Sequence, residues 1–66
     1  MSVLKVLEIM SNSEKSWEDA TRIGIKKASK TVKKIKSAFV QSHSVVVNDN
    51  EIAEYRVTLK ISFEVD

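Results

Sequence analysis

The chain has 66 residues, which is room for one small domain, residues 1–66, and not for two. A domain of this size buries only ~60% of its unfolded surface. With no cysteine and one histidine, the chain cannot form a disulfide or a zinc finger. We therefore expect oligomerisation to supply the missing stability. The formal net charge of +2 is a weak electrostatic signal for nucleic acid.

Signals for a membrane or for export do not stand out in the sequence. Its apolar runs are far shorter than the ~20 residues that cross a bilayer. Met1-Ser2-Val3-Leu4 enters a strand-like pattern without a basic leader or a cleavage site. We therefore expect a cytoplasmic chain with no membrane partner.

The first predicted element is a short strand. Residues from Val3 to Met10 are rich in β-branched and other apolar side chains. Ser11-Asn12-Ser13 follows and has the composition of a turn. The sequence predicts a strand that ends at Met10.

The second predicted element is a helix. We expect it to begin at Ser13 in preference to Ser16, although Asp19, three residues after Ser16, approximates a capping box. Its buried stripe would consist of small and apolar side chains at three- and four-residue steps, namely Trp17, Ala20, Thr21, Gly24, Ile25, Ala28, Thr31, Val32 and Ile35. The helix dipole favours the observed charge order, with Glu14, Glu18 and Asp19 in the first turns and Lys26, Lys27, Lys30, Lys33 and Lys34 in the last.

The last third of the chain predicts a β-hairpin. Residues from Ala53 to Val65 alternate strictly between apolar and polar, which places the two kinds of side chain on opposite faces of a strand. A second strand is expected from Ser37 to Val47, and Asn48-Asp49-Asn50 between the two has side chains that tolerate the angles of a tight turn.

These elements define an α+β fold with the order β-α-β-β. Because crossover connections join parallel strands, we expect the first and second strands to flank the third in a three-stranded sheet, each antiparallel to it. The sheet would half-wrap the single helix. Its other face would carry Arg56, Thr58 and Lys60 and meet solvent, a subunit or a ligand, so a functional site is expected there.

The whole chain resembles the dodecin family. The resemblance covers the opening strand, the helix start and the closing strand, quoted as Lys5-Val6-Leu7-Glu8-Ile9, Ser16-Trp17-Glu18-Asp19-Ala20 and Tyr55-Arg56-Val57-Thr58-Leu59-Lys60-Ile61-Ser62-Phe63. It implies a hollow homododecamer with itself as the main partner. In flavin-binding members it further implies flavins stacked inside the shell, held for storage or buffering without catalysis.

The ligand positions that the resemblance implies are Ser37, Phe39, Gln41 and Arg56. Flavin-binding members place a stacking tryptophan four residues before the position of Gln41, where this chain has Ser37. They tend to place a glutamine after the tyrosine of the third strand, where this chain has Arg56. A serine supplies neither the stacking geometry nor the apolar area of an indole, so we expect flavin binding to be weakened or lost. Phe39 on the same strand face and the Arg56 guanidinium could still contact a planar ring or a phosphate.

Calcium is the second cofactor that the resemblance implies. A subset of dodecin-like chains shares the Ser-Trp-Glu helix start and the Tyr-Arg pair, some of that subset is associated with calcium, and this chain is more similar to it. Calcium needs six to eight oxygens, and no continuous loop supplies them here. A site would need several chains, and its ligands stay unassigned among the carboxylates Glu8, Glu18, Asp19, Asp49, Glu51, Glu54, Glu64 and Asp66.

Other notable residues have simpler interpretations. Trp17 is expected to pack in the core or at a subunit contact, and Gly24, between Ala20 and Ala28, in a close helix contact. His43 is interpreted as an exposed or interface residue, because no catalytic triad or phosphate loop is visible. Arg56 is left open between a ligand contact and an inter-subunit ion pair with Glu8, Glu54 or Glu64.

The sequence therefore favours a non-catalytic dodecin-like protein that binds or stores small ligands or ions between subunits. The alternatives are a flavin-storage dodecin that keeps its site by other contacts, a nucleic-acid-binding module that uses the lysine-rich helix face, and an assembly without a ligand. Nucleic acid is the less favoured partner, since the chain has few aromatic residues for stacking on bases.

Overall fold

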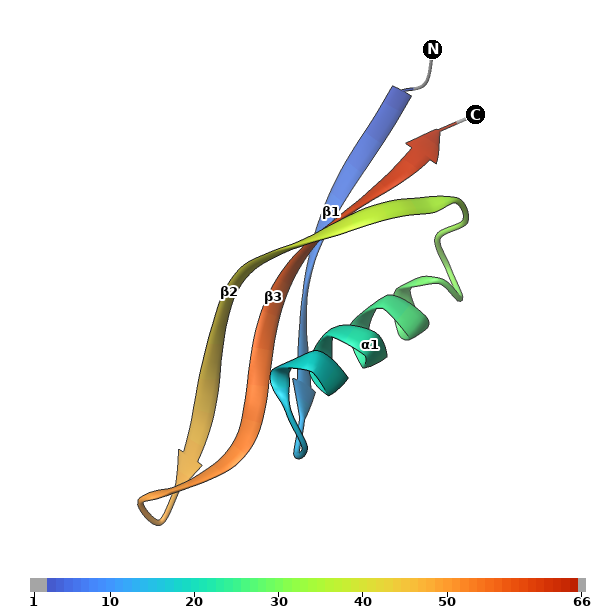
Figure 1. The fold of residues 1–66 in the computed structure, drawn as a ribbon. Coiled ribbons are helices and arrows are strands. Elements are labelled where there is room, and N and C mark those ends of the chain that lie inside the picture. Colours follow the sequence, from blue (N-terminus) through green and yellow to red (C-terminus); the bar gives the residue numbers. More distant parts are fainter. Residues whose placement is uncertain (1–2, 66) are drawn as a thin grey trace.

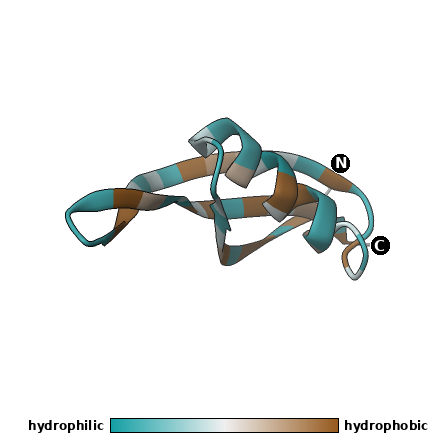
Figure 2. Ribbon diagram, turned by 90° about the horizontal axis from the view of Figure 1, so that it is seen from below, coloured by the Kyte–Doolittle hydropathy of each residue, from teal (hydrophilic) through white to brown (hydrophobic). Residues whose placement is uncertain are grey.

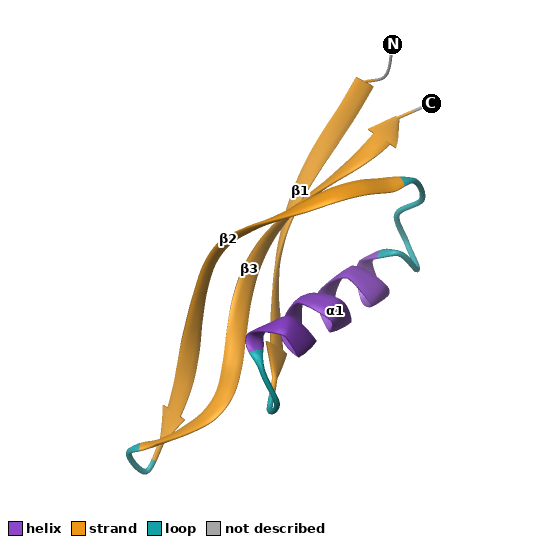
Figure 3. Ribbon diagram, viewed as in Figure 1, coloured by secondary structure: helices purple, strands orange, loops and turns teal. Residues whose placement is uncertain are grey.

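The computed structural model describes residues 3–65, and it contains three strands and one helix (Figures 1 and 3). The elements are β1 (Val3–Ser13), α1 (Trp17–Ala28), β2 (Ile35–Asn48) and β3 (Glu51–Val65). Met1, Ser2 and Asp66, which entered the expectations about a leader and about calcium, lie outside these residues. Within residues 3–65, no helix is long and apolar enough to span a membrane.

The predicted fold class is confirmed. The sheet has the strand order β1-β3-β2, and both β1 and β2 pair with β3 in antiparallel fashion. The two outer strands are therefore parallel to each other, as the crossover rule requires. Helix α1 lies across one face of this sheet (Figure 1).

Strand β1 is three residues longer than predicted, and the expected turn at Ser11-Asn12-Ser13 is wrong. Residues 11–13 continue the ladder and pair with residues 55–57 of β3. Ser11 and Ser13 are buried, at 9% and 6% exposure. The backbone hydrogen bonds offered by the long β3 outweigh the local turn preference of the three polar side chains.

The helix begins three residues later than favoured, so the Ser13 start is also wrong. Ser16 is the N-cap, with extended backbone (φ −170°), and its hydroxyl accepts a 3.0 Å hydrogen bond from the backbone N–H of Asp19. Ser13 supports the cap from outside the helix. Its hydroxyl donates to Asp19 Oδ2 at 2.6 Å and accepts from the backbone N–H of Lys15 at 2.9 Å.

The helix ends at Ala28, so the predicted stripe to Ile35 is too long. Ser29 caps the helix, and its hydroxyl donates to the carbonyl of Lys26 at 2.7 Å. Such side-chain bonds to the backbone compete with helix propagation. As a result only Lys26 and Lys27 belong to the last helical turn, whereas Lys30, Lys33 and Lys34 follow it.

The hairpin is confirmed. Strand β2 is longer than predicted by two residues at its start and one at its end, and β3 by two residues at its start. Its loop consists of Asp49 and Asn50, which both adopt positive φ angles of 51° and 63°. Two consecutive residues of this kind form the two-residue turn that matches the twist of the flanking strands. Three register shifts interrupt the β2–β3 ladder, the middle one between Val40 and Ser42.

The core is small because the helix is short. Its fully buried hydrophobic residues are Ala20 of α1 and Val57, Leu59 and Ile61 of β3. A helix of 12 residues is about 18 Å long, whereas a strand of 15 residues is about 50 Å long. The predicted burial of alternate residues therefore holds only in the middle of β3.

Hydrophobic residues also lie outside the cover of the helix. They recur along the whole sheet, including the part farthest from α1 (Figure 2). Trp17, predicted to lie in the buried stripe, is 38% exposed at the start of the helix. The chain therefore leaves much apolar surface uncovered.

Replacing the N-cap should weaken the helix. For Ser16→Ala we expect a loss of about 1 kcal/mol in the free energy of unfolding, measured by urea denaturation at fixed protein concentration, because the Asp19 N–H loses its acceptor. Ser29→Ala is the matched control, since its hydroxyl bonds only within the exposed helix end. Equal losses in the two variants would contradict the assignment of Ser16 as the cap.

Gly24 lies in close contact with the sheet, in agreement with its predicted packing role. A Cβ atom at this position would be 2.9 Å from Leu59 Cδ1 and 3.1 Å from Ser11 Cβ. Both neighbours are buried. Only glycine fits here without displacing one of them.

Gly24→Ala should therefore destabilise the protein by about 1 kcal/mol, although alanine is the better helix former, since overpacking costs more than helix propensity returns. Thermal and urea unfolding would measure the change. Leu59→Val removes the nearest methyl group, so the double variant should lose less than the sum of the two single variants. A more stable Gly24→Ala protein would show that the contact is not tight.

Candidate functional site

The face of the sheet opposite the helix is the candidate site, and we call it the open face. Side chains alternate between the two faces along each strand, and paired residues share a face. Because Val57, Leu59 and Ile61 face α1, the even-numbered residues of β3 from Glu54 to Glu64 and their partners form the open face. It consists of Leu4, Val6, Glu8, Met10, Asn12, Ser37, Phe39, Ser42, Ser44, Val46, Glu54, Arg56, Thr58, Lys60, Ser62 and Glu64.

Two predicted ligand positions, Ser37 and Phe39, lie side by side on the open face. Ser37 is paired with Ser62, and its hydroxyl donates to the Ser62 hydroxyl at 3.0 Å. Phe39 is paired with Lys60 and is 64% exposed. The surface available for stacking at this end of β2 is therefore the ring of Phe39.

Gln41 is in a different situation. It falls in the register shift between Val40 and Ser42, where β2 has one residue more than β3. Such a bulge leaves the extra residue without a cross-strand partner. The pairing therefore does not align Gln41 with Ser37 and Phe39.

Arg56 is held by a chain of polar contacts at the other end of the open face. Its Nε donates to Oδ1 of Asn12 at 3.0 Å, and Nδ2 of Asn12 donates to Oε1 of Glu54 at 2.8 Å. Arg56 and Glu54 are thus linked through Asn12. Sequence reasoning missed Asn12 because it placed this residue in a turn, and only the extended register of β1 brings it opposite Arg56.

Phe39 and Arg56 of one chain share a face but do not converge. Phe39 is opposite Lys60, which lies four residues along β3 from Arg56. At ~3.3 Å per residue this places the two positions about 13 Å apart. One chain therefore offers an aromatic surface and a cationic group at separate points.

The carboxylates of residues 3–65 do not gather into a metal site within one chain. Among residues 3–65, no three histidine or acidic side chains lie close enough to hold one ion. Glu8 is the cross-strand neighbour of Lys60 on the open face, and Glu54 accepts a hydrogen bond from Asn12. Calcium takes six to eight oxygen ligands, and the described part of one chain does not bring even three acidic or histidine side chains together.

Trp17 belongs to an aromatic cluster on the helix side of the sheet. Its ring meets His43 and Tyr55 edge to face, with centroid distances of 4.8 and 5.2 Å. The indole N–H donates to the carbonyl of Ser44 at 2.9 Å. These contacts attach the start of α1 to the hairpin, so Trp17 and His43 have a packing partner on the side opposite Phe39 and Arg56.

Comparisons with known proteins agree with this fold and sequence pattern. The sequence profile of the Dodecin family matches residues 3–66. The calcium dodecin of Mycobacterium tuberculosis is 34% identical over 64 residues, which are 97% of this chain and 90% of that protein.

Solved structures show the same backbone arrangement. The dodecin from Streptomyces davaonensis superimposes with a TM-score of 0.94 at 31% identity, covering 98% of this chain and 96% of that one. The calcium dodecin of Mycobacterium tuberculosis, described as having a novel calcium-binding site, superimposes with a TM-score of 0.86 at 33% identity, covering 98% and 93%. With the profile match over nearly its whole length, the chain belongs to the dodecin family.

Proposed function

We propose that this protein is a non-catalytic dodecin that assembles into a hollow homododecamer and holds small ligands or ions between its subunits, with flavin binding weakened. The observation that carries the proposal is the open face, where Phe39 and Arg56 are presented to the outside about 13 Å apart. Neither group completes a site alone. A second copy placed against the open face would supply the missing half.

Assembly is supported by the imbalance between buried and exposed hydrophobic residues. Four residues form the buried core. A longer set is at least 36% exposed, namely Val3, Leu4, Val6, Met10, Trp17, Phe39, Val40, Val45, Val47, Ile52 and Val65. Large exposed apolar surfaces of this kind mark interfaces, and a core this small rarely stabilises a chain alone.

Weakened flavin binding is supported by the contacts of Ser37. Its hydroxyl is satisfied by Ser62, and its side chain has no surface on which an isoalloxazine could stack. Phe39 supplies a smaller ring two residues further along β2. Arg56 supplies a cation that suits a phosphate or carboxylate group better than a neutral ring edge.

An ion between subunits is supported by the relationship to the calcium dodecin of Mycobacterium tuberculosis. Symmetry axes in an oligomer bring copies of one carboxylate together. Residues 3–65 of a single chain form no such cluster of carboxylates. Calcium is therefore the ion that we propose to test first. The site gives no support for a catalytic role, since Arg56, Asn12 and Glu54 are engaged with one another and Ser37 with Ser62 in structural hydrogen bonds.

Native mass spectrometry of the purified protein tests the proposal directly. We expect a species of twelve chains, either free of ligand or carrying increments of metal mass that increase when calcium is added. Flavin-sized increments would contradict the expected weakening and would support the storage alternative. A monomer or dimer at micromolar concentration would overturn the assembly.

Restoring the two family positions should restore flavin affinity. For Ser37→Trp combined with Arg56→Gln, we expect riboflavin to bind on the order of tenfold more tightly in a fluorescence-quenching titration, because an aromatic stack contributes ~0.5–1.5 kcal/mol beyond its buried area.

Ser44→Trp with Arg56→Gln is the matched control, since Ser44 lies on the same strand face as Ser37 but opposite position 56, away from the position of the family's stacking tryptophan. A gain in both double variants would show that any added indole suffices. No gain in either would mean that Ser37 does not explain the weak binding. Arg56→Gln alone shows whether loss of this side chain dissociates the assembly.

A further inference from the structure

The tip of the β2–β3 hairpin, residues 45–53, extends beyond the rest of the fold. β1 pairs with β3 only from Tyr55 onward, so the tip is a two-stranded ribbon (Figure 1). Val47 and Ile52 are cross-strand partners in the tip, and each is 56% exposed. The pair forms an apolar knob on a ribbon that is only marginally stable in water when nothing covers it.

The tip is also acidic. Asp49 is in the turn and Glu51 is the first residue of β3, next to the knob. No lysine or arginine lies between Val45 and Ala53. A surface that binds the tip would therefore need an apolar recess with positive charge at its rim.

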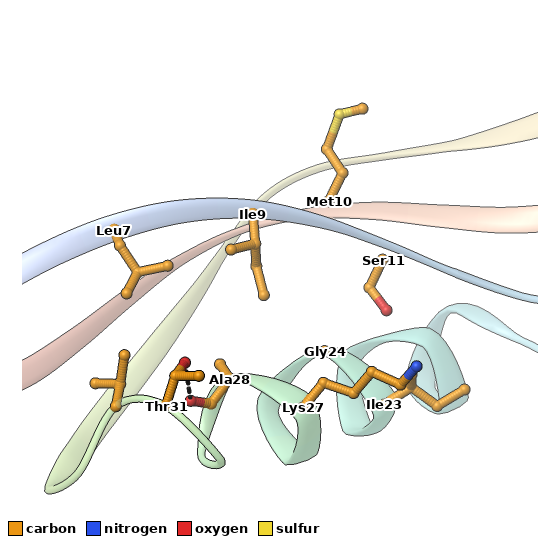
Figure 4. A pocket seen from close by; sticks show the side chains of 10 residues that line it. Leu7, Ile9, Met10, Ser11, Ile23, Gly24, Lys27, Ala28 and Thr31 are labelled. Atoms are coloured by element: carbon orange, nitrogen blue, oxygen red, sulfur yellow. Dashed lines mark hydrogen bonds between the residues drawn. The ribbon is translucent and has the colours of Figure 1, made fainter.

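A groove with these properties lies between α1 and β1 (Figure 4). Its volume is about 320 Å³, and it is lined mainly by apolar residues, namely Leu7, Ile9, Met10, Ser11, Ile23, Gly24, Lys27, Ala28, Thr31 and Val32. Leu7 and Ile9 point from the strand toward the helix, whereas Met10 points to the other side. Lys27 is the charged residue of the lining, and no acidic side chain takes part.

We propose that the hairpin tip of one chain docks into the α1–β1 groove of a neighbouring copy. Val47 and Ile52 enter the apolar groove, and Glu51 or Asp49 lies beside Lys27 at its rim. The tip of a chain does not reach the groove of the same chain, because the two lie in different parts of the fold (Figures 1 and 4). This inference rests on the proposed assembly and names one of its contacts.

The contact is heterologous, since tip and groove are different surfaces. Every chain would thus give its tip to one neighbour and receive the tip of another. Such contacts close into rings when the rotation between copies allows it, which suits a shell better than a simple dimer does. The contact also stabilises the two-stranded tip without using any residue of the buried core.

Cross-linking between two single-cysteine variants tests the contact, because the natural chain has no cysteine. One variant carries Ile52→Cys in the tip, and the other carries Ile23→Cys in the groove together with a mass tag. After co-refolding and treatment with a short bismaleimide, denaturing mass spectrometry should show the mixed dimer. The control pair combines Ile52→Cys with Glu18→Cys, which lies in the exposed first turn of α1 outside the groove.

We expect the mixed dimer with Ile23→Cys to exceed that with Glu18→Cys by at least about tenfold, given the reach of a short linker. Comparable yields from the two pairs, in a protein that still forms twelve chains, would overturn the docking and leave the proposed function intact. A natural protein that stays monomeric in native mass spectrometry would overturn the proposed function itself.

Charge reversal provides an independent test. Lys27→Glu and Glu51→Lys should each raise the concentration at which the assembly half-dissociates by roughly 3–10-fold, and the double variant should recover most of the loss. Lys26→Glu is the matched control, since Lys26 is exposed on α1 and does not line the groove. Equal effects of Lys26→Glu and Lys27→Glu, without recovery in the double variant, would contradict the pairing.

Discussion

A helix of 12 residues covers a strand of 15 residues only in part, and the other features of this structure depend on that mismatch. Under the helix, Ala20 meets Val57, Leu59 and Ile61 and forms a closed core. Beyond it, the same alternating strand continues without a cover. The apolar side chains of β1, β2 and the hairpin therefore remain available for contacts outside the chain.

The open face keeps its two candidate ligand-binding side chains apart. The β2–β3 ladder positions Phe39, and a hydrogen bond to Asn12 positions Arg56. In the assembly that we propose, their separation makes ligand specificity depend on how the copies are placed against each other. A change at a subunit contact can then alter the ligand without touching either residue, because it changes which groups face each other.

Much of the fold could be predicted because its signals are local. The alternation around Leu59 assigns the faces of β3, and Asp49 and Asn50 favour the turn that the structure contains. Strand β1 was predicted too short because the pairing of Ser11 with Val57 joins residues far apart in sequence. For the candidate site, the shared face of Ser37 and Phe39 followed from their spacing, whereas the link between Arg56 and Asn12 depends on that same distant pairing.

The outer strands β1 and β2 make an isolated copy of the chain prone to aggregation. β1 and β2 each carry an unpaired edge, 11 and 14 residues long. An edge of this length with apolar side chains is a template for any extended segment, and added strands of that kind lead toward cross-β aggregates. In the assembly that we propose, a neighbouring copy that covers these edges soon after folding would compete with aggregation for the same backbone groups and so protect the chain from irreversible aggregation.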